Sequence, residues 1–327
     1  MNIASLFEYG NAFLGARFAG RRVPLVVSIV VTNRCNYSCA YCDRWDGRGS
    51  RLSTEQLRGF LREMAEMGTR RVIFTGGEPL VRKDIYGLIA LCKTLGMKVN
   101  VNSNGTLVPQ QIERLKGLDG LTISIDGDRA THDEVRGEGA FDAAIAAVRA
   151  AREHPGIQVR LSCTLSRVSV GGEAELLEIA RREQVEVFFQ PAEHRLLGGE
   201  GDNPIAAPRE AYRRSIDTLI AAKKGGAPIA NSTSALRYLR GWPDGSALPC
   251  AGAKLFCRLD YDGRVMICGR MGEYEEAFSA IELGFREAFL KLNDARCPTC
   301  WCASRVEVNQ AFALRADAVL GLARASR

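Results

Sequence analysis

The sequence has no long run of apolar residues. Its longest apolar stretch, residues 24–31, is interrupted by Ser28 and is far shorter than the about 20 residues that a membrane-spanning helix needs. The N-terminus also lacks a basic segment followed by an apolar one, which argues against a secretory signal peptide. We therefore expect a cytoplasmic protein without a transmembrane helix.

Other features that are scarce narrow the class of protein further. Aromatic residues make up only 7% of the 327 residues, and there is no low-complexity segment or internal repeat of solenoid period. The net charge is only +6, with the basic residues spread along the chain, so nucleic-acid binding is not expected. The length is sufficient for about two domains with a sizeable core.

Histidine is scarce, whereas cysteine is abundant. The chain has three histidines and eleven cysteines. An odd number of cysteines without an export signal favours metal ligation over disulfide bonds, because cytoplasmic thiols stay reduced. Nine of the eleven gather in two clusters, within residues 35–42 and 250–302. Cys92 and Cys163 stand apart among apolar neighbours, so we expect both to be buried core residues.

Between residues 24 and 192 the chain alternates short β-branched runs with longer segments of helical periodicity. Six strands are predicted, over residues 25–33, 71–75, 98–103, 120–125, 158–165 and 186–190. Helices are predicted to begin near Ser53, Asp84, Pro109, Phe141 and Glu173, and another is expected over 209–224. Repeated strand–helix–strand units build parallel sheets. The fold class is therefore α/β, either a partial (βα)6 barrel or an open doubly wound sheet.

Three of the predicted strands have one polar face. In the third strand Asn100, Asn102 and Asn104 share a face, and the fourth and fifth strands repeat this pattern. Strands covered by helices on both sides are apolar throughout, so a polar face favours the barrel, with an interior that holds a hydrated ligand. The alternative is that a few polar residues are tolerated at strand ends.

The first cysteine cluster follows the first strand, where a barrel carries its chemistry. Cys35, Cys39 and Cys42 have the spacing CxxxCxxC. Three thiolates so close together indicate one metal centre, and three ligands leave one coordination position open for a small molecule. A structural zinc site is the alternative, but it needs a fourth ligand and no histidine is nearby.

The second strand ends in Gly76-Gly77-Glu78-Pro79. Two glycines let the backbone approach a ligand without a Cβ clash, and Glu78 supplies an anionic acceptor that suits an ammonium group. A plain strand-to-loop turn is the alternative.

The cysteine spacing with Tyr41 before the last cysteine, together with this glycine motif one strand later, resembles the radical S-adenosylmethionine (SAM) superfamily. The resemblance implies that Cys35, Cys39 and Cys42 hold three irons of a [4Fe-4S] cluster whose fourth iron is chelated by SAM. The implied cofactor-binding residues are Tyr41 beside the cluster, Gly76, Gly77 and Glu78 at the SAM amino group, and Asn104 and Ser124 at its ribose or carboxylate. Asp126 is implied as a further SAM contact of this kind, or is instead a substrate-side acid or base, or a cap of the Gly127 turn.

The second cluster contains Cys250, Cys257, Cys268, Cys297, Cys300 and Cys302. A strand pair around the turn at Asp262-Gly263 returns the chain toward its start, and the six thiols indicate a second metal site, iron–sulfur or zinc. The pattern resembles the auxiliary-cluster domains of the SPASM and twitch type. This implies one auxiliary [4Fe-4S] cluster on Cys250, Cys268, Cys297 and Cys300. Cys257 or Cys302 is an alternative ligand for one of these positions.

We predict three segments. Residues 1–23 form an N-terminal helix that packs on the barrel, with a membrane-surface helix as the alternative. Residues 24–225 form the radical SAM partial barrel. Residues 226–327 form the auxiliary-cluster domain, which ends in one helix from about residue 304 to the C-terminus.

The resemblance implies an oxidoreductase-like enzyme that cleaves SAM reductively and abstracts a substrate hydrogen with the 5′-deoxyadenosyl radical. Its implied partners are a one-electron reductant such as flavodoxin or ferredoxin and a small-molecule or lipid-linked metabolite, which is oxidised or rearranged. A peptide-modifying enzyme is the alternative substrate hypothesis. A non-catalytic iron–sulfur or zinc protein is the alternative of another class.

Overall fold

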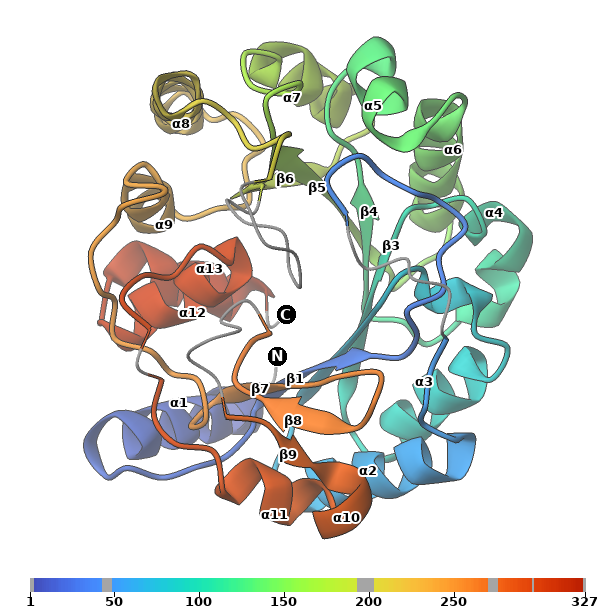
Figure 1. Cartoon of the computed structure of the whole chain (residues 1–327), viewed down its shortest axis with the longest axis vertical. Coiled ribbons are helices and arrows are strands. Elements are labelled where there is room, and N and C mark those ends of the chain that lie inside the picture. Colours follow the sequence, from blue (N-terminus) through green and yellow to red (C-terminus); the bar gives the residue numbers. More distant parts are fainter. Residues whose placement is uncertain (1–2, 43–48, 193–202, 270–275, 296, 326–327) are drawn as a thin grey trace.

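The computed structural model describes residues 3–42, 49–192, 203–269, 276–295 and 297–325. Its centre is one curved sheet of nine strands in the order β6-β5-β4-β3-β2-β1-β7-β8-β9 (Figure 1). The strands are β1 (Val26–Val30), β2 (Arg71–Thr75), β3 (Lys98–Ser103), β4 (Gly120–Ser124), β5 (Gln158–Leu165), β6 (Glu186–Pro191), β7 (Phe256–Leu259), β8 (Arg264–Met266) and β9 (Phe278–Ser279). Strands β1 to β6 are parallel, which confirms the six predicted strands.

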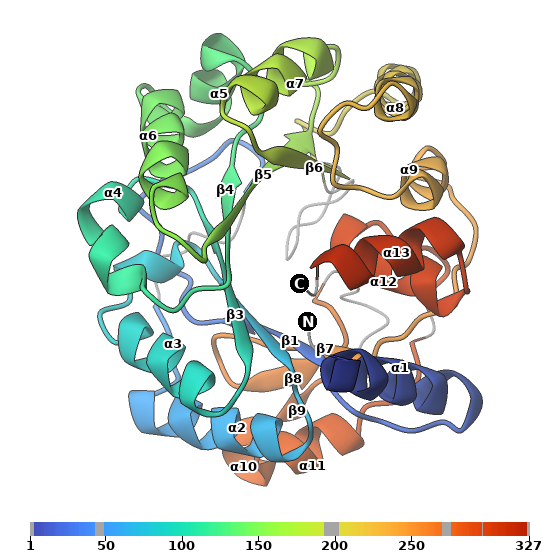
Figure 2. The ribbon, with the colours of Figure 1, turned by 180° about the vertical axis from the view of Figure 1, so that it is seen from behind.

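Helices join the parallel strands and cover the outer face of the sheet, so β1 to β6 form a partial (βα)6 barrel (Figure 1). Its helices are α2 (Thr54–Glu66), α3 (Ile85–Thr94), α4 (Val108–Gln111), α5 (Arg129–Arg136), α6 (Ala140–Arg152), α7 (Glu173–Arg182) and α8 (Arg209–Lys224), with short 3-10 turns η1 (Pro79–Val81) and η2 (Ile112–Leu115). The remaining helices are α1 (Ile3–Phe18), α9 (Thr233–Leu239), α10 (Ala280–Leu283), α11 (Phe285–Leu290), α12 (Ala303–Phe312) and α13 (Ala316–Ala325). Helices α9, α12 and α13 lie on the open side of the barrel, between β6 and β7 (Figures 1 and 2).

The start of α2 illustrates how local sequence sets these elements. Ser53 Oγ accepts a hydrogen bond from the Gln56 backbone N–H at 3.1 Å, and Gln56 Oε1 accepts one from the Ser53 N–H at 2.9 Å. This capping box satisfies two donors that a helix N-terminus leaves free. Leu57, Phe60 and Leu61 then recur at helical spacing and are buried, which fixes the face that α2 turns to the sheet.

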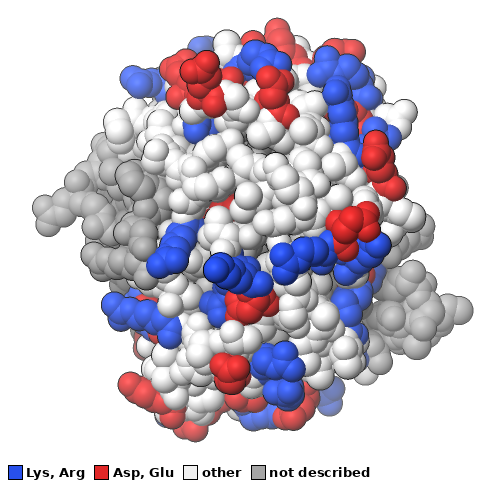
Figure 3. Space-filling model, turned by 90° about the vertical axis from the view of Figure 1, so that its right-hand side faces the viewer, with Lys and Arg blue, Asp and Glu red and all other residues white. Residues whose placement is uncertain are grey.

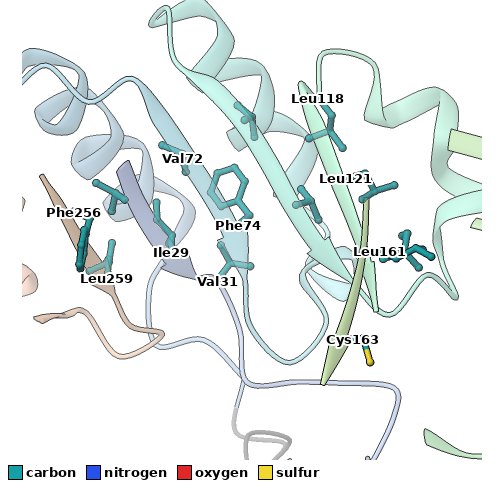
Figure 4. Close-up of a cluster of buried hydrophobic side chains, with 14 of the residues drawn as sticks. Ile29, Val31, Val72, Phe74, Leu118, Leu121, Leu161, Cys163, Phe256 and Leu259 are labelled. Atoms are coloured by element: carbon teal, nitrogen blue, oxygen red, sulfur yellow. The ribbon is translucent and has the colours of Figure 1, made fainter. Parts of the chain in front are cut away.

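The main hydrophobic core lies between the outer face of the sheet and its helices. Val72 and Phe74 of β2 and Leu121 of β4 are fully buried there (Figure 4). Residues on the opposite face are less buried, and Asn102 is exposed, so the predicted polar inner face of the barrel is confirmed. Cys92 and Cys163 are buried with exposed fractions of 0% and 2%, as expected for core residues.

The sheet continues beyond the first strand. β7 pairs in parallel with β1, with Val27 opposite Cys257, and β7 and β8 form the predicted antiparallel pair. The chain after residue 226 thus adds strands to the edge of the barrel sheet instead of forming a sheet of its own. An unpaired β1 edge offers backbone donors and acceptors that a returning strand satisfies.

Two local predictions were wrong or incomplete. The single C-terminal helix is two helices, because Leu314 has a φ of 61° between α12 and α13. This left-handed conformation ends a helix. Helix α5 was not predicted; Asp128 caps it by accepting from the Thr131 N–H, and it ends at Gly137 with a φ of 109°. Helices α9, α10 and α11 were also not predicted.

The N-terminal helix α1 packs on α12. The rings of Phe13 and Phe312 are 5.6 Å apart edge to face, and Arg17 Nε donates to the Phe312 carbonyl oxygen at 3.2 Å. Leu14 and Phe18 remain exposed at 52% and 68%. No helix in the described ranges combines the length and the hydropathy needed to cross a membrane.

The outer surface carries charges of both signs. Lys93 pairs with Asp119 at 2.7 Å, and Arg209, Arg240 and other basic residues have acidic partners as well. Figure 3 shows basic and acidic side chains close to one another on one outer face of the molecule. Exposed pairs of this kind stabilise a fold only weakly.

Candidate functional site

The first cysteine cluster lies on the loop that leaves the carboxyl end of β1, residues 31–42, which is the cysteine loop. Cys39 is buried, and Cys35 and Cys42 are half-buried. Burial raises the pKa of Cys39 to about 11, with the charges of the other two thiols adding to the rise and Arg136 opposing it. The Ala40 N–H donates to the Val135 carbonyl oxygen at 2.9 Å, so α5 holds this loop in place.

The three thiols are neighbours, but they are not yet gathered around one point. No group of three His, Cys, Asp or Glu side chains in the described ranges has a geometry that would hold a metal ion as it stands. The donor set nevertheless fits an iron–sulfur cluster, because three soft thiolates lie on one short loop at the mouth of the barrel.

The glycine motif after β2 packs directly against the start of the cysteine loop. The Gly77 N–H donates to the Thr32 carbonyl oxygen and the Glu78 N–H to that of Arg34, both at 2.8 Å. A Cβ on Gly76 would lie 2.3 Å from the Thr32 oxygen, and one on Gly77 would lie 2.3 Å from the Arg34 oxygen. The two glycines therefore permit the close approach of two backbone segments, not only the approach of a ligand.

We expect Gly77→Ala to destabilise the fold by about 1–3 kcal/mol, because the atoms that its Cβ would meet, the carbonyl groups of Arg34 and Asn33, belong to backbone that cannot move aside. Gly87→Ala in α3 is the matched control. Its added Cβ meets nothing within 4 Å, so this change is expected to stabilise the helix by about 0.5–1 kcal/mol. Urea unfolding of the apoprotein measures both effects. Equal midpoints for the two variants would contradict the packing argument.

Glu78 is fully buried and ties the end of β2 to the end of β3. Its carboxylate accepts from the Leu80 N–H at 3.1 Å, from Ser103 Oγ at 3.0 Å and from the Asn104 N–H at 2.8 Å. Burial raises the pKa of Glu78 to about 7, and these hydrogen bonds oppose the rise. Glu78 thus joins the ends of β2 and β3, and its expected role as an acceptor for an ammonium group stays a prediction.

Asn104 connects β3 to the cysteine loop. Its Nδ2 donates to Asn36 Oδ1 at 2.8 Å and approaches Cys35 Sγ at 3.9 Å. Its Oδ1 accepts from Thr106 Oγ1 at 2.7 Å, and Asn36 Nδ2 donates to the same hydroxyl at 2.6 Å. This network orients the loop next to its first cysteine. Ser124 is half-buried at the end of β4 and faces the barrel interior.

A buried network centred on Arg136 holds the other side of the cysteine loop. Arg136 Nε donates to Asp126 Oδ2 at 2.7 Å, Nη2 donates to the Tyr41 hydroxyl, and Nη1 approaches Cys39 Sγ at 3.8 Å. Burial disfavours the charged guanidinium, but the charge of Asp126 outweighs this and the pKa of Arg136 is raised. Arg136 was not among the predicted site residues.

Asp126 is enclosed, with an exposed fraction of 1%. Its Oδ1 accepts from the Thr164 N–H at 3.0 Å, and its own N–H donates to His132 Nδ1 at 3.0 Å. The Tyr41 hydroxyl donates to Oδ2 at 3.2 Å. Asp126 therefore positions Arg136 and Tyr41, and the roles that the sequence left open for it stay predictions.

In the second cysteine cluster, Asn309 of α12 contacts two cysteine-bearing segments. Its Nδ2 donates to Cys300 Sγ at 3.7 Å, and its Oδ1 accepts from the Ala251 N–H, next to Cys250, at 2.9 Å. The Tyr238 hydroxyl accepts from the Cys300 N–H at 3.0 Å, and burial raises its pKa to about 12, with Cys300 and Cys297 adding to the rise. Cys250, Cys297 and Cys300 thus gather beside α12.

The remaining cysteines of this cluster differ in their surroundings. Cys257 is fully buried in β7, opposite Val27 of β1, and faces the hydrophobic core; burial raises its pKa strongly. Cys302 precedes α12, and its Sγ is 3.2 Å from Ser304 Oγ. Cys268 is half-buried just beyond β8. Cys257 is therefore the least accessible of the six thiols for a cluster.

The sequence pattern of the Radical SAM superfamily matches residues 29–173. This range contains the end of β1, the strands β2 to β5, the three cysteines of the loop, the glycine motif and the Arg136 network. Residues 29–173 are a radical SAM domain.

Relatives with this domain carry the names of enzymes. The chain is 30% identical to the Fe-coproporphyrin III synthase of Methanosarcina barkeri over 62% of this chain and 52% of that protein. It is 27% identical to the AdoMet-dependent heme synthase of Nitratidesulfovibrio vulgaris over 73% of this chain and 72% of that protein. It is 29% identical to the GTP 3′,8-cyclase of Marinobacter nauticus over 76% of this chain and 80% of that protein. The chain thus spans about half the length of the first relative and most of the other two.

Solved structures share the fold of this chain at low sequence identity. The protein anSMEcpe with bound AdoMet aligns with a TM-score of 0.67 and 16% identity, over 83% of this chain and 81% of that chain. Streptococcus suis SuiB bound to S-adenosylmethionine aligns with a TM-score of 0.65 and 18% identity, over 85% of this chain and 68% of that chain. Radical SAM enzymes bind a [4Fe-4S] cluster and SAM.

Proposed function

We propose that this protein reductively cleaves SAM and uses the resulting 5′-deoxyadenosyl radical to abstract hydrogen from a small-molecule substrate. The observation that carries the proposal is that two separate segments, one after β3 and one on α5, both contact the loop that bears the three cysteines. Asn104 contacts the loop at Cys35, and Arg136 contacts it at Cys39. Such a double attachment suits a loop whose three thiolates must keep one fixed arrangement.

Cys35, Cys39 and Cys42 would hold the [4Fe-4S] cluster, which supplies one electron to SAM when bound. Arg136 places positive charge beside Cys39 and so favours its thiolate form. Gly76 and Gly77 bring the β2 loop against the start of the cysteine loop, next to the SAM amino group in the proposed arrangement. Glu78 fixes that loop, and Ser124 lines the interior where SAM would extend.

Cys250, Cys268, Cys297 and Cys300 would hold one auxiliary [4Fe-4S] cluster. The chemistry of the donor set fits, because Asn309 contacts the Cys300 thiol and the backbone next to Cys250, and it supplies the kind of hydrogen bond that tunes cluster sulfurs. The burial of Cys257 argues against its use, so Cys302 is the remaining alternative ligand. A zinc ion on the same thiols is the alternative metal.

The substrate is a small molecule in this proposal. The half-buried and exposed polar side chains on the inner strand faces suit a hydrated ligand. The relatives named heme synthase and GTP 3′,8-cyclase support this class, because the chain matches most of their length. SuiB bound to its precursor peptide SuiA favours the peptide alternative, but its 15% identity reflects fold alone. A lipid-linked metabolite is a variant of the small-molecule hypothesis.

Metal content is the first test. After anaerobic reconstitution we expect about eight irons and eight sulfides per chain, with no zinc, because two [4Fe-4S] clusters are proposed. About four irons with one zinc would assign the second site to zinc. Iron without formation of 5′-deoxyadenosine from SAM under strong reduction would favour the non-catalytic alternative.

The substrate class is tested with a deuterated extract. Small metabolites and peptides from cells grown in deuterated medium are separated by size and chemistry and are added separately to the reduced enzyme with SAM. Abstraction of deuterium from the substrate yields 5′-deoxyadenosine that is one mass unit heavier. We expect the label with the small-metabolite fraction, and label only with the peptide fraction would overturn this class.

A further inference from the structure

Arg305 is a buried cation on α12, and no carboxylate of the described residues lies within ion-pair distance of it. Its exposed fraction is 7%. Its Nη2 donates to Ser28 Oγ at 3.1 Å and to the Cys257 carbonyl oxygen at 3.4 Å, and its guanidinium lies 4.2 Å from the centre of the Phe256 ring. Neutral partners do not offset the cost of burying a full charge, so an anion is expected nearby.

The neighbouring arginine provides a contrast. Arg258 of β7 lies close by in the sheet, and its Nη2 is 3.1 Å from Asp260 Oδ1. Its charge is therefore balanced by a carboxylate that the chain itself supplies. Within the described ranges, no carboxylate plays this role for Arg305.

The face of α12 that carries Arg305 also contacts the second cysteine cluster. Asn309 lies four residues later and thus on the same face of the helix. Asn309 Nδ2 donates to Cys300 Sγ at 3.7 Å, and its Oδ1 accepts from the Ala251 N–H next to Cys250. The Arg305 backbone N–H donates to the Cys302 carbonyl oxygen at 2.8 Å. Arg305 and Asn309 therefore lie on the same face of α12, the face that contacts the second cysteine cluster.

We propose that Arg305 is the counter-charge of the auxiliary cluster and raises its reduction potential; this inference rests on the auxiliary cluster of the proposed function. A [4Fe-4S] cluster with four thiolate ligands is anionic and gains one more negative charge on reduction. A buried cation stabilises the reduced form more than the oxidised form, because Coulomb energy grows with the charge of the partner. Arg305 thus acts on the cluster only through its charge, and it does not itself react.

The test uses the full chain with Cys35, Cys39 and Cys42 replaced by Ala, so that only the second site contributes signal. The midpoint potential of the reconstituted cluster is measured by a dithionite titration followed by electron paramagnetic resonance. We expect Arg305→Gln to shift the midpoint to a more negative value and Arg305→Lys to stay close to the parent. The exposed Arg240, which pairs with Asp217 at 2.7 Å, supplies the control Arg240→Gln, which is expected to leave the midpoint unchanged.

Each outcome decides the proposal. A loaded Arg305→Gln variant with the parent midpoint overturns it. If Arg305→Gln binds no cluster, loading of Arg305→Lys supports a requirement for charge, whereas failure of both variants overturns it in favour of a role in shape. Circular dichroism of the apoproteins shows whether each variant is folded.

Failure of the proposed function gives a different result. A parent protein that takes up no iron in the triple-alanine background overturns the auxiliary cluster itself, and this is visible before any Arg305 variant is made. A loaded parent with an unshifted Arg305→Gln midpoint overturns only the role of Arg305.

Discussion

Replacing Cys39 by Ala is expected to lower the rate of 5′-deoxyadenosine formation from SAM by more than about 100-fold, because loss of a direct ligand exceeds the 10–100-fold effect typical of residues behind the ligands. Cys39 is the most buried of the three loop thiols and the one that Arg136 contacts. The measurement is chromatography of 5′-deoxyadenosine after anaerobic reduction, normalised to protein concentration.

The matched comparison is Cys300→Ala, which should retain part of the SAM cleavage while losing about four irons, since the second site has a separate role in the proposal. Cys92→Ala is the control for a buried cysteine outside both clusters, and it should keep full iron content. Equal loss of SAM cleavage in Cys39→Ala and Cys300→Ala, with both proteins folded, would contradict the division of roles between the two sites.

Asp126→Asn is expected to destabilise the apoprotein by about 3–5 kcal/mol, because it leaves the charge of Arg136 buried without its anion. The side chains of this pair have exposed fractions of 7% for Arg136 and 0% for Asp126. Asparagine retains one acceptor and the shape of aspartate, so the main loss is the charge. The free energy of unfolding in urea, measured without iron, reports the effect separately from cluster binding.

An exposed pair of the same residue types provides the control for this prediction. Arg129 and Asp142 bind each other at the surface, with exposed fractions of 56% and 66%. Water screens that pair, so Asp142→Asn should leave the unfolding midpoint nearly unchanged. Similar destabilisation by the two substitutions would show that burial of the Arg136 pair contributes no special cost, and would contradict the role assigned to Asp126.

Much of the barrel could be predicted because its signals are local. The strands β2, β3 and β5 begin and end where the alternation of apolar residues begins and ends, and the capping box at Ser53 marks the start of α2. Helix α5 was missed because it is short and largely polar. The break at Leu314 was missed because no glycine or proline marks it in the sequence.

The spacing of the cysteines and the glycine motif determined the family of this protein, because a cluster on one short loop depends on local sequence. Tertiary structure alone decided the environment of the surrounding side chains. It buried Glu78 as a brace, joined Asp126 to Arg136, and enclosed Cys257 in a strand that pairs with β1. The physical reason is that burial and charge balance arise from segments far apart in the sequence, whose contacts no local pattern encodes.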